Sequence, residues 1–349
     1  MAKKTKNERP FVYKAVVNEL YEAGPKALYL LYGPEDYLRE DYLGKLKALC
    51  IPEGEDSFSY KRFNGPGVDL RELAEAMDTP PFLTERSFIE IRDEDLNQLS
   101  DAKSFLSLLE TIPDYCTVAL VQGTQFTPDG RLKTVGAIRR LAVEIKFTQS
   151  PEDVLIKWIA RRFAAFGKRI EMEAAQHLIF VSGNLMNRLI PEIDKIAAYA
   201  KGEAVTVADV DAVAHHLPEA QVYEMADHLS RHEYNVAMQV LYELLSDKNN
   251  KPVAILAMLG SQMRRLYAAR LAIDEGLGAD YLSELYGNTG SFAFRQLNSA
   301  RGFSLEQLKR AVEICAETDL QLKSSSADDA ALLEEAVLRI AAGETDAEN

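Results

Sequence analysis

The stretch "LYLLYGPEDYLREDYL" places Gly33 between an apolar segment and a segment with helical spacing. This order is typical of a phosphate-binding P-loop, whose pattern Gly-x-x-x-x-Gly-Lys-Ser/Thr supplies backbone N–H groups for phosphates, a lysine for charge and a hydroxyl for magnesium. Counted from Gly33, the second glycine position holds Leu38 and the lysine position holds Arg39. The hydroxyl position holds Glu40, whose carboxylate would stand where phosphate and metal meet. The sequence therefore predicts a degenerate P-loop, which keeps the scaffold and lacks the chemistry that binds a nucleotide.

Two further elements of an ATP-hydrolysing site, the Walker B carboxylates and an arginine finger, are missing from the segments expected to carry them. A Walker B element needs an apolar strand ending in Asp-Glu, which holds magnesium and orients the attacking water. The segment "CTVALVQGTQF" instead continues through Gln122, and the first carboxylate after it is Asp129. An arginine finger is expected near the end of the same region, where Gln149 and Ser150 stand. We therefore predict no catalytic residue and no cofactor, with an active ATPase or another P-loop nucleotide-binding enzyme as the alternative.

A second candidate site is the turn "TPPFLTER", which follows a helical segment. Pro80 and Pro81 cannot continue a helix, so they would hold the next residues in an extended projection. Phe82 and Leu83 then offer an aromatic and an aliphatic anchor, and anchors that fill a partner's pocket carry much of the energy of an interface. We interpret these two residues as a binding pair, with a shift to Pro81 and Phe82 as an alternative register. The other interpretation is that both side chains pack back onto the protein as the small core of a loop.

The elements that must position these residues are strands and helices in alternation over residues 1–148. Five short segments rich in β-branched and aromatic residues are predicted as strands, and helical patterns lie between them. This alternation predicts an α/β domain with a mostly parallel five-stranded sheet, in which ligands bind at the carboxyl ends of the strands, where Gly33 lies. The strand segments are "ALYLLYG", "FSYKRFNG", "SFIEIRD", "CTVALVQG" and "AVEIKFT", and the helical patterns cover 35–49, 69–77, 96–109 and 131–141.

Beyond this domain the strand-like segments stop and helical patterns continue, the first of them opened by Ser150 as its N-cap. We predict a small helical lid domain over residues 149–217 and an all-helical collar domain over residues 218–343. The last residues, 344–349, are expected to be a disordered tail. An α/β domain with a P-loop-like turn, followed by a small helical domain, is the order found in AAA+ ATPases.

Composition and charge exclude several classes of protein. The net charge of −14, from 40 basic and 54 acidic residues, argues against a chain that coats nucleic acid by itself. The three cysteines stand far apart, so they suggest neither a disulfide framework nor a zinc site and are typical of a reducing cytoplasm. No apolar run is long enough to span a membrane. His228 and His232 have helical i, i+4 spacing but no acidic or cysteine partner at a recognisable spacing, so we predict no metal site.

Several stretches together resemble the delta subunit of the bacterial DNA polymerase III clamp loader, from about residue 10 to residue 342. "LYLLYGPEDYLREDYL" is similar to that family's first strand and degenerate P-loop, and "AMDTPPFLTERSFIEIRD" to its second helix, clamp-binding turn and following strand. "SGNLMNRLIPEIDKIAAYA" resembles the family's pattern of a glycine, an arginine and Glu-x-x-Lys. "KPVAILAMLGSQMRRLYAARLA", "ARGFS" and "ETDLQLKSS" resemble its third domain. The order and spacing of these stretches carry the identification.

The resemblance implies a non-catalytic subunit of the replication machinery. In that family, delta joins a pentamer with the delta-prime subunit and three ATP-hydrolysing gamma or tau subunits, and it does not hydrolyse ATP itself. It binds the ring-shaped sliding clamp, beta, and helps to hold one interface open so that DNA can enter. The family's clamp-contacting pair falls on Phe82 and Leu83, while primer-template DNA is met through the complex. A bare scaffold with no clamp contact is a third interpretation.

Overall fold

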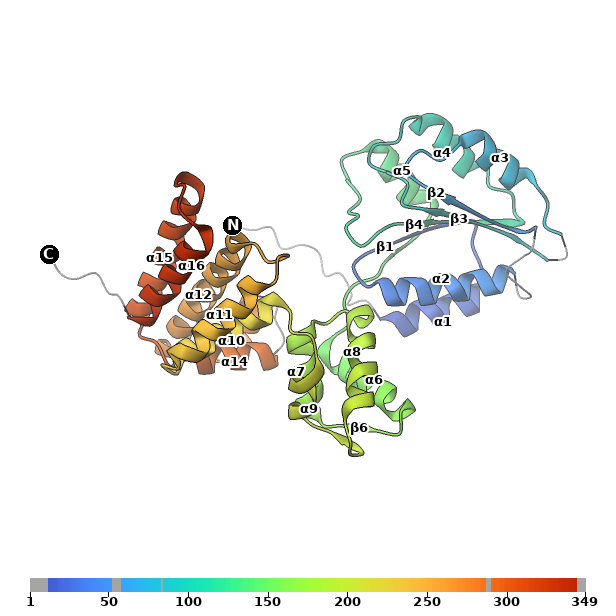
Figure 1. Cartoon of the computed structure of the whole chain (residues 1–349). Coiled ribbons are helices and arrows are strands. Elements are labelled where there is room, and N and C mark those ends of the chain that lie inside the picture. Colours follow the sequence, from blue (N-terminus) through green and yellow to red (C-terminus); the bar gives the residue numbers. More distant parts are fainter. Residues whose placement is uncertain (1–11, 52–57, 83, 287–289, 344–349) are drawn as a thin grey trace. The chain divides into compact units, whose positions relative to one another are not determined.

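The computed structural model describes most of the chain, and its contacts divide the chain into two compact units (Figure 1). The first unit runs to Leu155 and also contains Asn184–Ile190, and the second holds the rest. The predicted division into three domains, with limits after residues 148 and 217, stays a prediction. The predicted tail, 344–349, lies outside the described residues. The described residues are 12–51, 58–82, 84–286 and 290–343.

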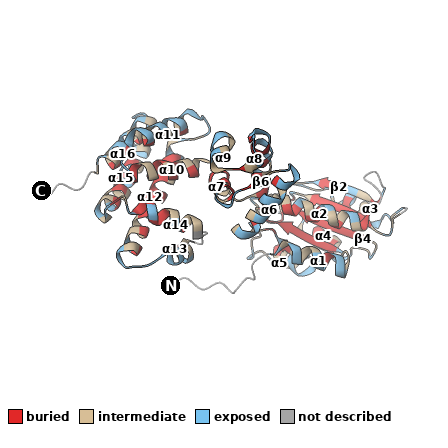
Figure 2. Cartoon of the chain, turned by 90° about the horizontal axis from the view of Figure 1, so that it is seen from below, coloured by how far each residue is buried: buried red, intermediate tan, exposed pale blue. Residues whose placement is uncertain are grey.

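The first unit is built on a five-stranded sheet with the order β2-β3-β4-β1-β5. Each pair of neighbouring strands is parallel, which confirms the predicted α/β fold class. The three central strands are buried along almost their whole length, as expected of a parallel sheet covered on both faces, and Figure 2 shows them in red. The strands are β1 (Leu28–Tyr32), β2 (Tyr60–Asn64), β3 (Ser87–Arg92), β4 (Cys116–Val121) and β5 (Val143–Lys146).

Helices cover both faces of this sheet, with α1 and α2 on one face and α3, α4 and α5 on the other (Figure 1). On the first face, the ring of Tyr42 in α2 lies 6.3 Å from that of Tyr29 in β1 and 5.8 Å from that of Phe147. On the second face, Leu73 and Phe105 are buried in one core cluster with strand residues. The helices are α1 (Tyr13–Ala23), which was not predicted, α2 (Asp36–Cys50), α3 (Leu70–Asp78), α4 (Ala102–Glu110) and α5 (Lys133–Leu141).

The connection from β1 to α2 contains only three residues, because β1 ends at Tyr32 and α2 begins at Asp36. Gly33 has a φ of +119°, a backbone conformation that residues with a side chain rarely adopt. A Cβ at Gly33 would lie 2.3 Å from the carbonyl oxygen of Phe147. The same carbonyl accepts a hydrogen bond from the N–H of Glu35 at 3.2 Å. Glycine at this position therefore allows the chain to pass directly from strand to helix.

The elements after β5 are mainly helical, and the core of the second unit forms around its longest helix, α12. This helix packs closely on α15, where a Cβ at Gly260 would lie 3.4 Å from the Cβ of Cys315. Among the described residues, no helix is both long and apolar enough to cross a bilayer. These elements are α6 (Glu152–Ala165), β6 (Arg169–Ile170), α7 (Met172–Ser182), α8 (Met186–Tyr199), β7 (Ala204–Val205), α9 (Val207–Val213), α10 (Pro218–Ser230), α11 (Tyr234–Ser246), α12 (Pro252–Asp274), α13 (Ala279–Tyr286), α14 (Gly290–Ala300), α15 (Leu305–Ser324) and α16 (Asp329–Ala341).

The prediction that strands stop after residue 148 was wrong. β6 and β7 pair in parallel, with Arg169 opposite Ala204 and Ile170 opposite Val205. Strands of two residues have no alternation of apolar and polar side chains, so sequence periodicity could not reveal them.

The close approach at Gly33 predicts a large loss of stability on substitution. Gly33→Ala should lower the free energy of unfolding by about 3 kcal/mol, because the methyl group meets the Phe147 carbonyl and the backbone conformation is strained. Gly44→Ala in α2 is the matched control, since a Cβ there meets nothing within 4 Å. It should stabilise the helix by roughly 0.5–1 kcal/mol. Denaturant unfolding measures both changes, and equal effects of the two substitutions would contradict the assigned constraint.

Candidate functional site

The predicted P-loop positions Leu38, Arg39 and Glu40 lie on helix α2 and not in a loop. A P-loop holds phosphate with the N–H groups of the glycine-rich segment between strand and helix. Here the helix has already begun at Asp36, so the segment that would wrap around a phosphate is replaced by the short turn at Gly33. The strand–turn–helix scaffold is present, but its geometry differs from that of a nucleotide-binding loop.

Arg39 stands at the lysine position of the P-loop pattern, and its guanidinium forms hydrogen bonds within the turn itself. Its Nη1 donates a hydrogen bond to the Gly33 carbonyl at 3.1 Å, and its Nη2 bonds the Asp36 carboxylate. The residue is 4% exposed. A buried cation needs such partners, and the Asp36 carboxylate and the Gly33 carbonyl compensate the charge of Arg39 within the fold. Arg39 is therefore committed to the turn and is not directed toward an external phosphate.

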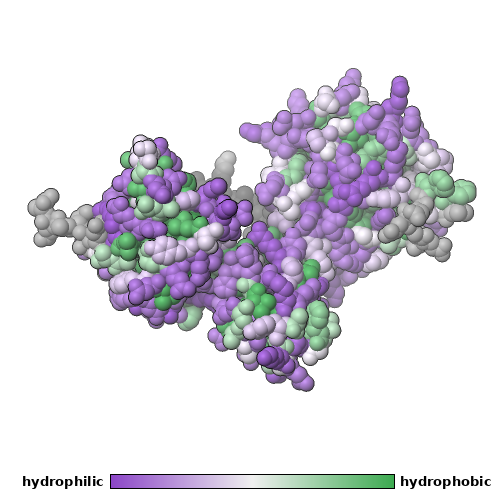
Figure 3. Space-filling model, viewed as in Figure 1, coloured by the Kyte–Doolittle hydropathy of each residue, from purple (hydrophilic) through white to green (hydrophobic). Residues whose placement is uncertain are grey.

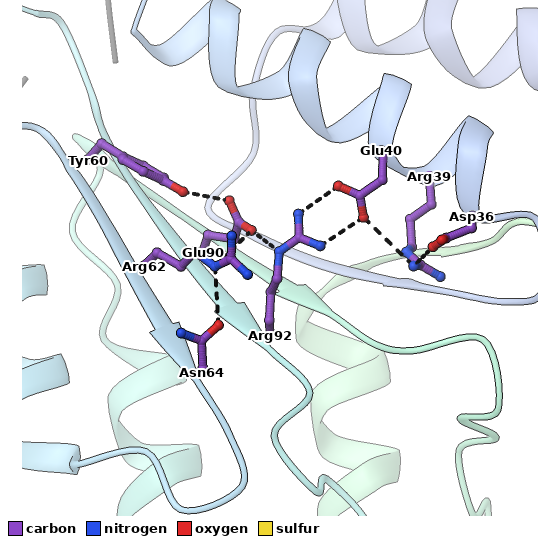
Figure 4. Close-up of polar contacts among 8 residues, drawn as sticks. All are labelled: Asp36, Arg39, Glu40, Tyr60, Arg62, Asn64, Glu90 and Arg92. Atoms are coloured by element: carbon purple, nitrogen blue, oxygen red, sulfur yellow. Dashed lines mark hydrogen bonds and ion pairs between the residues drawn. The ribbon is translucent and has the colours of Figure 1, made fainter. Parts of the chain in front are cut away.

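A chain of ion pairs continues from Glu40 across the sheet (Figure 4). Glu40 accepts two hydrogen bonds from Arg92, at 2.9 and 2.7 Å. Arg92 also bonds Glu90, which accepts a hydrogen bond from the Tyr60 hydroxyl at 2.9 Å. Burial alone would raise the pKa of Glu40, but the hydrogen bonds and charge of Arg92, together with the charges of Arg39 and Arg62, outweigh burial and lower it. The carboxylate at the hydroxyl position thus has a cationic partner within the fold.

Glu35, which the sequence reasoning did not single out, closes the end of the helix. Its side chain is 0% exposed at the N-cap of α2, the end at which the helix dipole favours an anion. Its Oε2 accepts a hydrogen bond from the N–H of Met186 at 3.3 Å. Burial raises the pKa of Glu35 to about 7, and the Met186 amide opposes part of this rise. A carboxyl group of the chain itself therefore lies at the helix end that a P-loop would offer to phosphate.

An Asp-Glu pair that the sequence search overlooked directly follows β3. Glu94 is 5% exposed, and its Oε2 accepts hydrogen bonds from the N–H groups of Gly67 at 2.8 Å and Val68 at 3.0 Å. Asp93 is exposed beside it, with a φ of +54°. The Walker B search had considered only the strand that became β4, although "FIEIRDE" was a visible signal. Glu94 serves to fasten the connection between β2 and α3, while Asp93 has no such role.

The predicted binding turn lies between α3 and β3, and it presents Phe82 to solvent. The side chain of Phe82 is 60% exposed, so it does not form the core of a loop. Its N–H donates to Ser59 Oγ at 3.1 Å, and the Ser59 hydroxyl lies 3.3 Å from the Phe82 carbonyl, to which it donates. Pro81 is of intermediate exposure beside it, and Leu83 lies outside the described residues.

His228 and His232 contact separate neighbours. Nδ1 of His228 lies 2.6 Å from Oε2 of Glu233, and Nδ1 of His232 lies 2.7 Å from the hydroxyl of Tyr234. In the part of the chain that the structure describes, no group of three or more histidine, cysteine, aspartate or glutamate side chains could hold a metal ion.

Known proteins match this chain along most of its length. Residues 219–340 match the family model described as the C-terminal domain of the DNA polymerase III delta subunit. Over 324 residues the chain is 22% identical to DNA polymerase III subunit delta of Bacillus subtilis (strain 168), which covers 90% of this chain and 92% of that protein. The chain is therefore similar to DNA polymerase III delta proteins along most of its length, and its C-terminal part matches the model of that family's C-terminal domain.

A relative from a second organism and a solved structure are also described as delta proteins. The chain is 26% identical over 157 residues to a protein described as a probable DNA polymerase III subunit delta of Aquifex aeolicus (strain VF5), covering 44% of this chain and 45% of that protein. The solved structure of the Bacillus subtilis DNA clamp loader delta protein (YqeN) shares 21% identity and a TM-score of 0.53, covering 95% of this chain and 100% of that one. This likeness supports the delta fold of a parallel sheet followed by helices.

The pattern by which the sequence resembled the delta family lies at the end of α7 and in α8. Gly183 follows α7 with a φ of +85°, and Arg188 lies in α8. Glu192 pairs with Lys195 at 2.6 Å and accepts a hydrogen bond from the N–H of His215 at 2.9 Å. Glu192 therefore connects α8 to the segment that precedes α10.

The raised pKa of Glu35 predicts a stability that depends on pH. The pKa is about 7 in the folded protein against an ordinary value of 4.5, so the folded chain binds a proton that the unfolded chain releases. The stability that this group contributes is fully present below pH 4.5 and is lost as pH rises through about 7. Glu35→Gln removes this dependence. From pH 5 to pH 8, the free energy of unfolding of the variant should therefore rise relative to that of the wild type by on the order of 1 to 3 kcal/mol.

Urea unfolding of both proteins at the two pH values measures this gain. All other titrating groups are common to both proteins, so their contributions cancel in the comparison. A difference between the two proteins that stays constant from pH 5 to pH 8 would show that Glu35 has an ordinary pKa.

Proposed function

We propose that this chain is a clamp-loader delta subunit of DNA polymerase III that binds the sliding clamp, beta, and helps to open it for loading onto primed DNA. The observation that carries the proposal is the exposure of Phe82, which is 60% accessible on a backbone bonded to Ser59. An aromatic anchor that is already held in place loses little conformational freedom when it fills a partner's pocket. Pro81 and Leu83 flank this anchor, and Leu83 completes the pair that we propose contacts the clamp.

We also propose that the chain does this without hydrolysing ATP. The turn at Gly33 supports this proposal, because side chains of the protein itself occupy or pair with the positions that would bind a nucleotide. Glu35 stands at the end of the helix, Arg39 bonds the turn, and Glu40 is paired with Arg92. A nucleotide would have to displace the buried side chain of Glu35 and separate the buried Arg39 from its partners, which is costly in a low dielectric.

The proposed partners are the delta-prime subunit and the ATP-hydrolysing gamma or tau subunits, with primer-template DNA met through the complex. Exposed apolar side chains on the helices of the second unit support this, since such surface is often covered by another protein. Leu320 of α15 is 67% exposed, and Leu338 of α16 and Tyr242 of α11 are each 52% exposed. All three cysteines are free and buried, which supports the cytoplasm as the place of this assembly.

One observation favours the alternative function, an active AAA+ ATPase. Asp93 and Glu94 follow an apolar strand, as a Walker B pair would, and Asp93 is exposed. Steady-state ATP hydrolysis by the purified chain, compared with Asp93→Asn, decides between the two functions. Asparagine tolerates the left-handed backbone of Asp93. We expect no turnover by either protein, whereas turnover by the wild type that Asp93→Asn abolishes would establish the ATPase.

Phe82→Ala should weaken binding to the cognate sliding clamp by on the order of 2 kcal/mol, or about 30-fold in Kd, because an anchor of the interface is removed. The melting temperature should stay within about 2 °C of the wild type, since the side chain is mostly exposed. Tyr21→Ala is the matched control, because Tyr21 is an aromatic residue of the same unit with 56% exposure on α1.

Binding is measured by surface plasmon resonance or calorimetry, with circular dichroism melts of all three proteins. An equal loss for Phe82→Ala and Tyr21→Ala would assign the contact to something other than this turn. Failure of the wild type to bind the clamp would remove the proposed function and leave a scaffold subunit.

A further inference from the structure

Phe58 lies beside Phe82 although 24 positions separate the two residues in the sequence. Their ring centroids are 6.4 Å apart and the ring planes meet at 86°, an edge-to-face pair. Phe58 is 88% exposed, the largest exposed fraction among the bulky apolar side chains in the described part of the chain. Neither ring belongs to the core cluster on this face of the sheet. The pair is therefore an exposed aromatic surface for which packing of the unit itself gives no reason.

Ser59 holds together the two backbone segments that carry these rings. Its carbonyl accepts a hydrogen bond from the N–H of Phe88 in β3 at 2.7 Å, which holds its backbone in the sheet. Its hydroxyl contacts both the N–H and the carbonyl of Phe82, and lies 2.7 Å from Oγ1 of Thr84. Ser59 is 3% exposed, so these bonds are shielded from water. Phe58, which directly precedes it, and Phe82 are thus carried by one hydrogen-bonded frame.

Polar side chains lie next to Phe58. They line, with Phe58, a hollow of about 230 Å³ and include Lys61, Glu75 and Thr79. Lys61 also forms an ion pair with Glu72 at 2.7 Å. Apolar anchors at the centre and polar groups at the edge are the usual arrangement of a protein-binding surface. Figure 3 shows hydrophobic atoms in separate patches on a face that is otherwise largely hydrophilic, one of them at the outer edge of the first unit.

We infer that Phe58 is a further anchor of the clamp contact beside Phe82 and Leu83, so that the clamp receives two rings in an edge-to-face pair and not the ring of Phe82 alone. This inference rests on the proposed function, because it assigns the same partner to a larger surface. The partner that covers this surface is the sliding clamp, through an apolar pocket wide enough for both rings. We assign this partner because Phe58 contacts Phe82, which is part of the proposed clamp contact. Two pre-positioned rings bury more apolar area than one and need no rearrangement to enter together.

The test is the affinity of the full chain for the cognate clamp, measured for wild type, Phe58→Ala, Phe82→Ala and the double variant. Phe58→Ala should weaken binding at least tenfold. The double variant should lose less than the product of the two single losses, because the rings contact each other and their contributions are coupled. Phe58→Leu, which keeps an apolar side chain, should retain more affinity than Phe58→Ala. Tyr21→Ala should bind as the wild type does.

The outcomes separate this inference from the proposed function. If Phe58→Ala binds like the wild type while Phe82→Ala is weakened, Phe58 is not an anchor and the proposed function stands. Losses that multiply without coupling would show that the rings do not act as a pair. If the wild type itself does not bind, the proposed function falls and the inference falls with it. Circular dichroism melts of each variant confirm that a weakened variant is still folded.

Discussion

The first unit depends on the contact between Gly33 and the backbone of Phe147. This contact lets β1 pass into α2 through a turn of three residues, and it fixes where the helix begins. Because α2 begins directly after this turn, Arg39 and Glu40 lie in its first turns, and the buried Glu35 lies at its N-cap. A longer connection would leave backbone N–H groups free to surround a phosphate. One backbone contact thereby determines that the helix end is filled by the protein's own side chains.

The sheet separates two kinds of site at its two ends. The turn at Gly33 and the ion pairs of Glu40 and Arg92 lie at or near the carboxyl ends of the parallel strands. Phe58 and Phe82 precede β2 and β3, so they lie at the amino ends. The carboxyl end holds charges that are paired within the fold, while the amino end holds apolar rings exposed to solvent. The proposed clamp contact therefore lies at the opposite end of the sheet from the P-loop-like turn.

The sequence predicted much of this arrangement, and its failures have physical causes. The five parallel strands and the changed P-loop positions followed from apolar runs and from counting along one motif. The roles of Glu35 and Phe58 depend on contacts with Met186 and Phe82, which are distant in sequence, so no local pattern could reveal them. The strands β6 and β7 were too short for any periodicity. The Asp-Glu pair after β3 was visible, but the search had assigned the motif to another strand.

The hydrogen bonds between the Ser59 hydroxyl and the backbone of Phe82 also bear on how access to this surface can be controlled. A loop that is ordered only on binding can be regulated by changing its order. The backbone of Phe82 is already hydrogen-bonded to Ser59, which directly precedes β2. A change in the order of the loop would therefore have little effect on this residue. For the proposed clamp contact, control would instead come from occlusion, in which a neighbouring protein covers or uncovers the two rings without changing their geometry. The timing of the contact would then be set by movements of the assembly around this subunit and not by folding within it.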